Sequence, residues 1–247
     1  TTLFRSSLFS ERRDDYAICA SSPFLRENLK LLVACDVSSK YTRRGFSEYE
    51  KMAEYIYEMA AGKQGNYMVF FPSYRMLEDI YEIFQKKTEE RQFEVSCILQ
   101  SSNMTEKERE EFLEAFQENA TETLIGFCVM GGIFSEGIDL TGERLIGAAI
   151  VGTGLPQVGY EREILKNYYD EKAQNGFAYA YRYPGMNKVL QAAGRVIRTK
   201  EDKGVVFLLD ERFLQREYLE LFPQEWQEYE RCTIGNAGQK IRDFWDS

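Results

Sequence analysis

Two arginines, a glutamine and a glycine stand close together in Gln191-Ala192-Ala193-Gly194-Arg195-Val196-Ile197-Arg198, the stretch from which the architecture follows. On a helix that advances about 100° per residue, Gln191, Arg195 and Arg198 occupy positions i, i+4 and i+7 and share one face. Guanidinium groups stay protonated and present a planar fork of donors that suits phosphate oxygens. Gly194 has no side chain to keep a ligand or a neighbouring backbone at a distance. The spacing therefore predicts a helix with a polyphosphate-binding face. The alternative interpretation is an ordinary solvated helix face.

A second informative stretch follows a strand predicted over residues 123–129. It reads Gly131-Gly132-Ile133-Phe134-Ser135-Glu136-Gly137-Ile138-Asp139-Leu140, with three glycines within seven residues. Loops at the carboxyl ends of parallel strands are where open α/β sheets bind ligands. A ligand-binding loop is therefore expected here.

A third stretch lies earlier in the chain, where a strand over residues 67–71 runs into Pro72-Ser73-Tyr74. A helix with apolar residues at helical spacing follows it. This strand–loop–helix order is a βα unit, and Ser73 has the side chain and position of a helix N-cap.

Strands and helices alternate from residue 29 to residue 221. Further strands are expected over 29–35, 94–99, 145–151 and 204–210, and helices over 49–61, 160–171 and 211–221. Thr105 and Glu108 form a capping box for one more helix. The strands alternate with helices, and the connecting loops are too short for hairpin meanders. This order predicts an α/β fold with a doubly wound, mostly parallel central sheet that is covered on both faces.

Three local expectations accompany this order of elements. Ile164, Leu165 and Tyr168 should point inward from their helix. The aromatic alternation of residues 176–185 suggests a buried edge strand or a packed loop, with packing favoured over base stacking. A short strand is expected at 16–20, and the tail 223–247, with both tryptophans, should pack on the sheet.

Composition excludes several classes of chemistry. Histidine is absent, which removes Ser-His-Asp and Cys-His nucleophile systems and imidazole-containing zinc sites. The five cysteines are dispersed without a C-x-x-C pair, as expected of reduced thiols in a cytoplasmic protein, and no metal site is expected. A net charge of −9 counts against a generally basic nucleic-acid-binding surface, and no run of eighteen apolar residues indicates a membrane span.

The order Q-x-x-G-R-x-x-R, followed by Thr199-Lys200 and the predicted strand at 204–210, resembles the last conserved motif of superfamily 2 helicases, most closely the DinG/XPD branch. The F-F-P-S-Y sequence ending at Tyr74 is similar to motif IV of that family, and G-x-x-S-E-G-I-D, ending at Asp139, is similar to motif V. The three motifs stand in the family's order, and the resemblance covers roughly residues 20–220.

The resemblance implies a RecA-like three-layer domain, the second of two motor domains of an ATP-dependent DNA helicase. Arg195 and Arg198 would then stabilise the transferring phosphoryl group, and Gln191 would orient the nucleotide or the attacking water. Further residues would contact the two ligands: Glu136, Gly137, Asp139 and Gly194 the nucleotide, and Ser73, Tyr74 and Ser135 the nucleic-acid strand.

The sequence lacks the Walker A pattern G-x-x-x-x-G-K-[ST], so ATP and Mg²⁺ would be bound mainly by an absent first motor domain. The expected partners are that N-terminal motor domain and single-stranded DNA or a DNA duplex junction. Relatives carry an iron–sulfur cluster in their other motor domain, and none is expected in this chain.

Thr1 in place of an initiating Met suggests an excised piece of a longer protein, inactive alone. Residues 1–22 are expected to be a linker and 23–247 the RecA-like domain, with a role in DNA repair. A non-catalytic RecA-like module that binds nucleic acid or protein is the alternative.

Overall fold

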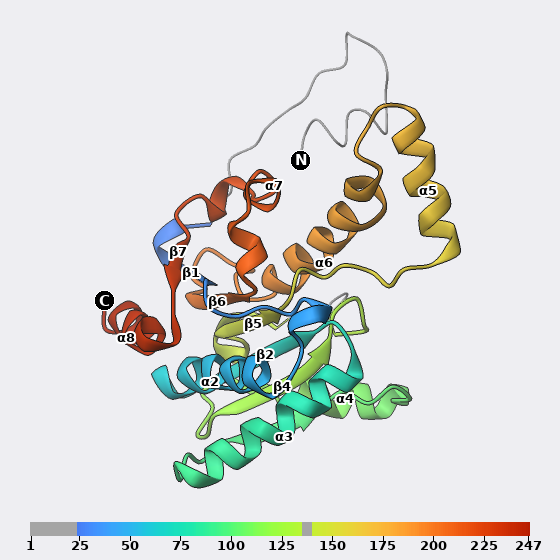
Figure 1. Cartoon of the computed structure of the whole chain (residues 1–247). Coiled ribbons are helices and arrows are strands. Elements are labelled where there is room, and N and C mark those ends of the chain that lie inside the picture. The colour runs from blue at the N-terminus through green and yellow to red at the C-terminus, as the bar shows by residue number, and fades with distance from the viewer. Residues whose placement is uncertain (1–23, 135–139) are drawn as a thin grey trace.

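The computed structural model describes residues 24–134 and 140–247, whose centre is a seven-stranded sheet (Figure 1). Every strand pair in it is parallel, and the spatial order is β3-β4-β2-β5-β6-β1-β7. The strands are β1 (Leu29–Ala34), β2 (Asn66–Phe71), β3 (Ser96–Leu99), β4 (Leu124–Val129), β5 (Gly147–Val151), β6 (Gly204–Leu209) and β7 (Glu230–Cys232).

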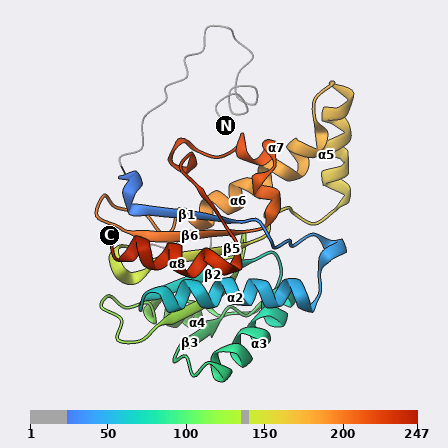
Figure 2. The same cartoon turned by 60° about the vertical axis from the view of Figure 1, so that its left-hand side comes forward.

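Helices cover both faces of this sheet, as Figures 1 and 2 show. One face is packed by α2 (Phe46–Gly62), α3 (Tyr74–Glu90) and α8 (Ile234–Trp245). The other is packed by α4 (Glu106–Glu114), α6 (Tyr183–Ala193), α7 (Arg216–Leu219) and the 3₁₀ turn η5 (Glu211–Leu214). A further helix, α5 (Tyr160–Glu171), stands at the periphery.

The central strands are apolar throughout because both of their faces are covered. In β1, Leu31 and Val33 belong to one core and Leu32 and Ala34 to the other, as expected from the period of two along a strand. The predicted three-layer α/β fold with a parallel sheet is confirmed.

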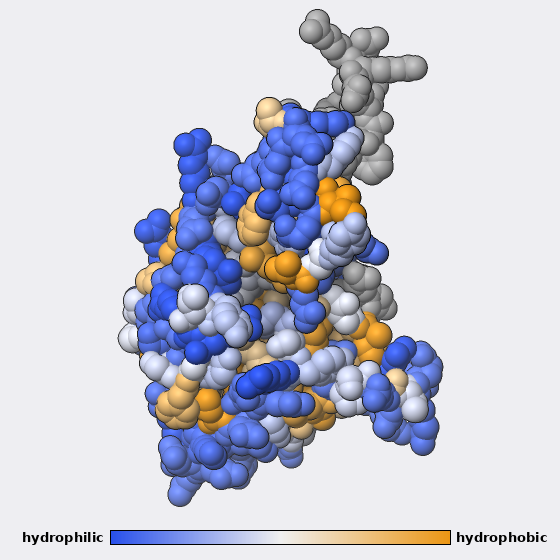
Figure 3. Space-filling model, turned by 45° about the vertical axis from the view of Figure 1, so that its right-hand side comes forward, coloured by the Kyte–Doolittle hydropathy of each residue, from blue (hydrophilic) through white to orange (hydrophobic). Residues whose placement is uncertain are grey.

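The prediction that α5 buries Ile164, Leu165 and Tyr168 is wrong. These side chains are 52%, 38% and 48% exposed, and α5 contains no buried residue. Figure 3 shows apolar residues on that side as separate patches on a mostly hydrophilic surface. The helical periodicity is real, but periodicity does not specify which element covers a helix face.

The predicted edge strand or packed loop at 176–185 is also wrong, because the segment is helical. A π-helical turn, η4 (Ala178–Arg182), leads directly into α6. Phe177 stacks on Tyr181, with ring centroids 5.4 Å apart, and Tyr179 contacts Tyr183 edge-on at 5.2 Å. Residues four apart on a helix are neighbours, so aromatic packing is satisfied without a strand.

The tail packs on the sheet as predicted, through elements that the sequence did not specify. β7 pairs with β1 in parallel, and α8 contributes Ala237 and Ile241 to the core beside α2. The helix expected over 211–221 is divided into η5 and α7 at Gln215, whose ψ of 143° is extended. The strand expected at 16–20 lies outside the described residues.

Candidate functional site

The arginine segment begins where α6 ends. The helix stops at Ala193, and Gly194 is its C-cap, donating its backbone N–H to Leu190 O at 2.9 Å. Gln191 is exposed in the last helical turn, Arg195 lies partly buried in the following turn, and Arg198 is exposed beyond it. The prediction that Gln191, Arg195 and Arg198 share one helix face is therefore wrong. Gly194, with the β-branched Val196 and Ile197 soon after it, favours an end of the helix here.

Asp202 fixes the course of the segment after the helix. Its carboxylate accepts hydrogen bonds from the backbone N–H of Arg198 at 2.6 Å and of Thr199 at 2.7 Å. It also accepts from the Thr199 hydroxyl at 2.7 Å and from the backbone N–H of Gly142 at 3.1 Å. One buried side chain thereby joins the arginine segment to the chain that follows the glycine loop.

The charge of Asp202 is retained in this setting. Burial by itself raises the pKa of the carboxyl, but hydrogen bonds from Thr199 and from the backbone of Arg198 hold that pKa below its ordinary value. The sequence analysis did not identify this residue. Its only local signal is a hydroxyl three residues earlier, at Thr199, in the pattern of a side-chain-capped turn.

The arginine segment lies at the amino-terminal edge of the sheet. Arg198 and Thr199 precede β6, Gly142 precedes β5, and the side chain of Asn28, just before β1, donates to Lys200 O at 3.1 Å. In contrast, Ser73 and Gly131 follow β2 and β4 and lie at the carboxyl-terminal edge. Arg198, predicted to contact phosphate, and Ser73, predicted to contact nucleic acid, thus lie at opposite edges of the sheet.

The glycine loop is described at its two ends. Gly131 has φ of +71°, a conformation that favours glycine, and an added Cβ there would lie 3.1 Å from Lys188 Nζ. Lys188 is on α6, three residues before Gln191, so the helix places a cation against the start of the loop. The predicted residues Ser135, Glu136, Gly137 and Asp139 lie outside the described residues.

Ser73 is the N-cap of α3, as predicted, and its hydroxyl oxygen accepts from the backbone N–H of Met76 at 3.3 Å. The neighbouring Tyr74 is held by Gln100, whose side-chain amide donates to the Tyr74 hydroxyl at 3.1 Å. The amide oxygen of Gln100 accepts from Val129 N at 2.9 Å. Gln100, which the sequence analysis missed, therefore ties together the loops after β2, β3 and β4.

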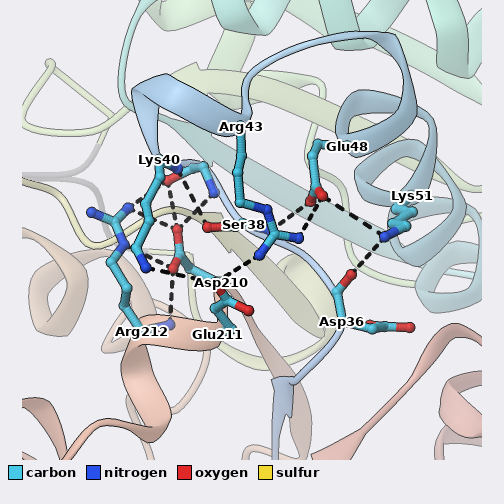
Figure 4. Close-up of polar contacts among 10 residues, drawn as sticks. Asp36, Ser38, Lys40, Arg43, Glu48, Lys51, Asp210, Glu211 and Arg212 are labelled. Carbon is cyan, nitrogen blue, oxygen red and sulfur yellow. Dashed lines mark hydrogen bonds and ion pairs between the residues drawn. The ribbon is translucent and has the colours of Figure 1, made fainter.

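A polar network braces the loop that follows β1 (Figure 4). Asp210 is fully buried and accepts from the backbone N–H and hydroxyl of Ser39 at 2.8 and 2.7 Å. Arg212 donates to both Asp210 oxygens, at 2.9 and 2.8 Å, and to the Ser39 hydroxyl at 2.8 Å. Burial raises the pKa of Asp210, but Arg212 and Ser39 hold that pKa below its ordinary value.

An apolar cavity of about 290 Å³ adjoins the arginine segment. Leu190, Gly194 and Ile197 line it from one side, and Leu25 and Trp226 from the other. An apolar lining does not suit phosphate groups. This side of the segment is therefore suited to an apolar contact.

Among residues 24–134 and 140–247, no helix is long and apolar enough to cross a membrane. Within the same described ranges, no three or more His, Cys, Asp or Glu side chains are grouped to hold a metal ion.

The all-parallel sheet with helices on both faces is a RecA-like α/β fold, as in solved structures of helicase domains. The chain belongs to the helicase C-terminal domain family, whose model matches residues 56–229.

Two curated relatives illustrate the similarity. A probable ATP-dependent helicase of Methanocaldococcus jannaschii is 27% identical over 203 residues, which are 78% of this chain and 30% of that protein. The regulator of telomere elongation helicase 1 of Bos taurus is 27% identical over 265 residues, 98% of this chain and 22% of that protein. The chain thus spans less than a third of either relative.

Solved structures agree on the fold. Apo XPD superposes with a TM-score of 0.66 at 21% identity, covering 83% of this chain and 40% of that one. S. tokodaii Xpd4 gives 0.62 at 14% identity, covering 94% and 47%. S. cerevisiae Dbp5 bound to RNA and ADP–BeF₃ gives 0.52 at 13% identity, covering 89% and 45%.

Proposed function

We propose that this chain is the second motor domain of an ATP-dependent DNA helicase and that it completes an ATP site on a preceding motor domain. The observation that carries the proposal is the anchoring of the arginine segment by Asp202, in a chain of the helicase C-terminal domain family. A segment whose backbone is already fixed presents its arginine side chains from defined positions and loses less conformational entropy on binding. Residues 23–247 form the domain in this proposal, and 1–22 form the linker to it.

In this proposal Arg195 and Arg198 stabilise negative charge on the transferring phosphoryl group. Arginine fingers of this kind accelerate turnover by about a thousandfold or more. Gln191, at the end of α6, orients the nucleotide or the attacking water, and Gly194 leaves room beside them. Glu136, Gly137 and Asp139 supply the remaining nucleotide contacts from the loop between β4 and β5.

The side chains of Arg195, Arg198 and Gln191 suit the phosphates of ATP, because two of them are cations and the third carries an amide donor. The absence of a Walker A sequence assigns Mg²⁺ and the main ATP contacts to the other motor domain. Bound Mg²⁺ would neutralise charge on the β- and γ-phosphates. Any iron–sulfur cluster is likewise assigned to that domain, as is the carboxylate that assists attack.

Single-stranded DNA is the proposed track, held at the carboxyl-terminal edge of the sheet by Ser73, Tyr74 and Ser135. The support comes from Tyr74, which is linked through Gln100 to the end of β4. This linkage holds together the loops that are proposed to bind the DNA strand. Motor domains of this kind open and close with each hydrolysis cycle, and the grip on the strand alternates with them. DNA repair in the cytoplasm is the proposed setting.

The test is single-strand-stimulated ATP hydrolysis by a polypeptide carrying this chain after a Walker A domain, compared with the chain alone. We expect turnover in the longer polypeptide and none in the chain. The net charge of −9 favours the second candidate, a non-catalytic binding module. Strand binding without hydrolysis in either polypeptide would establish that module instead.

A further inference from the structure

A groove of about 440 Å³ opens beside Ser73, between the loop after β1 and the first turns of α3. Its lining includes Tyr41, Arg44 and Tyr49 from the first part of the chain, and Ser73, Arg75 and Asp79 from the start of α3. The groove therefore extends the carboxyl-terminal edge of the sheet outward from the predicted strand contact.

Tyr41 gives this groove an open aromatic surface. The residue lies in the 3₁₀ turn η2 (Tyr41–Arg43) and is 84% exposed. The guanidinium of Arg44 stands over its ring, 5.6 Å from the centroid. An aromatic ring on the surface, backed by arginine, offers a flat face on which another planar group can stack.

Two arginines of the groove remain available for a ligand's negative charge. Lys40 and Arg43 are paired with Glu211, and Arg43 also with Glu48, at distances between 2.6 and 3.7 Å. Among the described residues, neither Arg44 nor Arg75 forms an ion pair, and Arg44 donates instead to Ser39 O at 3.2 Å. This edge thus presents positive charge on a chain that is acidic overall.

Arg44 and Arg75 both act electrostatically on Tyr49, which also lines the groove. Burial raises the pKa of the Tyr49 hydroxyl, and Arg44 and Arg75 both oppose that rise, whereas Asp79 adds to it. Asp79 follows Arg75 by one helical turn, so the negative charge lies further along α3. Among the residues that line the groove, the positive charges of Arg44 and Arg75 therefore outnumber the negative charge of Asp79.

The loop that carries Tyr41 and Arg44 is anchored before any ligand arrives. Ser39 is fixed by Asp210 and Arg212, and Arg43 ties the turn to α2 and to Glu211. Figure 4 shows Arg43 reaching Glu48 and Glu211 from this turn. Preorganisation of this kind lowers the entropic cost of binding.

We propose that this groove binds single-stranded nucleic acid, with Tyr41 stacking on one base and Arg44 and Arg75 contacting the flanking phosphates. Proteins that bind single strands without sequence preference combine aromatic stacking with a positive groove. The proposal rests on the proposed function, because the strand is the one that passes Ser73, and it adds a subsite beyond the motif IV contact.

The test is fluorescence anisotropy of a labelled oligothymidine of about 15 nucleotides titrated with this chain at low salt. We expect Tyr41→Ala to weaken binding by about fivefold or more, because the substitution removes the stacking of one base on an aromatic ring. Tyr41→Phe should keep the wild-type affinity. Tyr160→Ala is the matched control, because Tyr160 is 82% exposed on α5, outside the groove.

Salt dependence tests the arginines separately. For a single strand, each phosphate contact contributes about 0.7 to the slope of log affinity against log salt, so Arg75→Ala should lower the slope by about that amount. Arg216→Ala, at an exposed arginine paired with Glu220, should leave the slope unchanged.

The possible results distinguish a failure of the groove proposal from a failure of the proposed function. If the wild-type chain binds the oligothymidine and the Tyr41→Ala and Tyr160→Ala variants bind it equally well, the groove proposal is wrong. The assignment of the chain as a motor domain would not be affected. No binding by the wild-type chain at low salt would overturn the groove and the strand grip of this domain. The completion of an ATP site is judged independently, by hydrolysis in the longer polypeptide.

Discussion

The carboxylate of Asp202 accepts a hydrogen bond from the backbone N–H of Arg198, with an N···O distance of 2.6 Å. Because the same carboxylate also accepts from the backbone N–H of Gly142, one side chain holds the arginine segment and the chain that follows the glycine loop. Arg198 is thus positioned through its main chain, and the residue as a whole is exposed.

We expect Asp202→Ala to destabilise the chain by about 1–3 kcal/mol, because the substitution leaves backbone N–H groups without their acceptor. Urea unfolding measures the change. Glu201→Ala is the matched control at an exposed neighbouring carboxylate, and its effect should stay within about 0.5 kcal/mol. Equal stabilities for the two variants would contradict the anchoring role.

Arg212→Ala should be more damaging, at about 3–5 kcal/mol, because the fully buried Asp210 carboxylate would lose its cationic partner. Arg216→Ala removes an arginine whose side chain is 90% exposed and should cost about 0.5 kcal/mol or less. Thermal or urea unfolding of both variants checks this. A small effect at Arg212 would mean that Asp210 is satisfied by Ser39 and by the backbone N–H of residue 212.

Acid should destabilise the fold partly through Asp210. The pKa of Asp210 is lowered in the folded state, so the unfolded chain binds the proton more tightly. Its contribution to stability is therefore complete above the ordinary aspartate pKa of about 3.9 and is lost as pH falls through the lower folded-state value. In urea titrations across this range, Asp210→Asn should show a shallower loss of stability than wild type, and parallel curves would contradict the assignment.

Gln100→Leu should cost about 1–3 kcal/mol, since Val129 N would lose its buried acceptor and the Tyr74 hydroxyl would lose a donor. Weaker oligothymidine binding should accompany it, because Tyr74 would no longer be fixed. Gln92→Leu, at an exposed glutamine in the turn after α3, is the control for both measurements. Unchanged stability and binding in Gln100→Leu would show that the three loops are positioned by other contacts.

The order of strands and helices was predictable because each central strand is an apolar run between turn residues. Ser73 as an N-cap and Thr105 with Glu108 as a capping box were predicted and are confirmed, since those patterns depend on residues within one turn. Contacts between distant segments carry no such local signal. Each of Asp202, Gln100 and Asp210 binds a distant partner that only the folded sheet brings near: Gly142, Val129 and Ser39, respectively.

The errors have the same origin. The aromatic alternation at 177–183 fits a strand as well as it fits the helical packing that the structure adopts. The apolar stripe of α5 gave no information about what would cover it. The three-residue strand β7, Glu-Arg-Cys, is too short and too polar for a periodic signal. The helix expected to continue to Arg198 ends at Ala193, and Asp202 takes up the amides of Arg198 and Thr199 beyond it.

The most direct test of the proposed function is single-strand-stimulated ATP turnover by the longer polypeptide carrying Arg198→Ala, measured beside Lys200→Ala, an exposed cation two residues further on. We expect Arg198→Ala to lower turnover by about a thousandfold while ATP affinity stays within a few fold, because the guanidinium acts on the transferring phosphoryl group. Lys200→Ala should retain turnover. Wild-type turnover in Arg198→Ala would contradict the assignment of this chain as the domain that completes the ATP site.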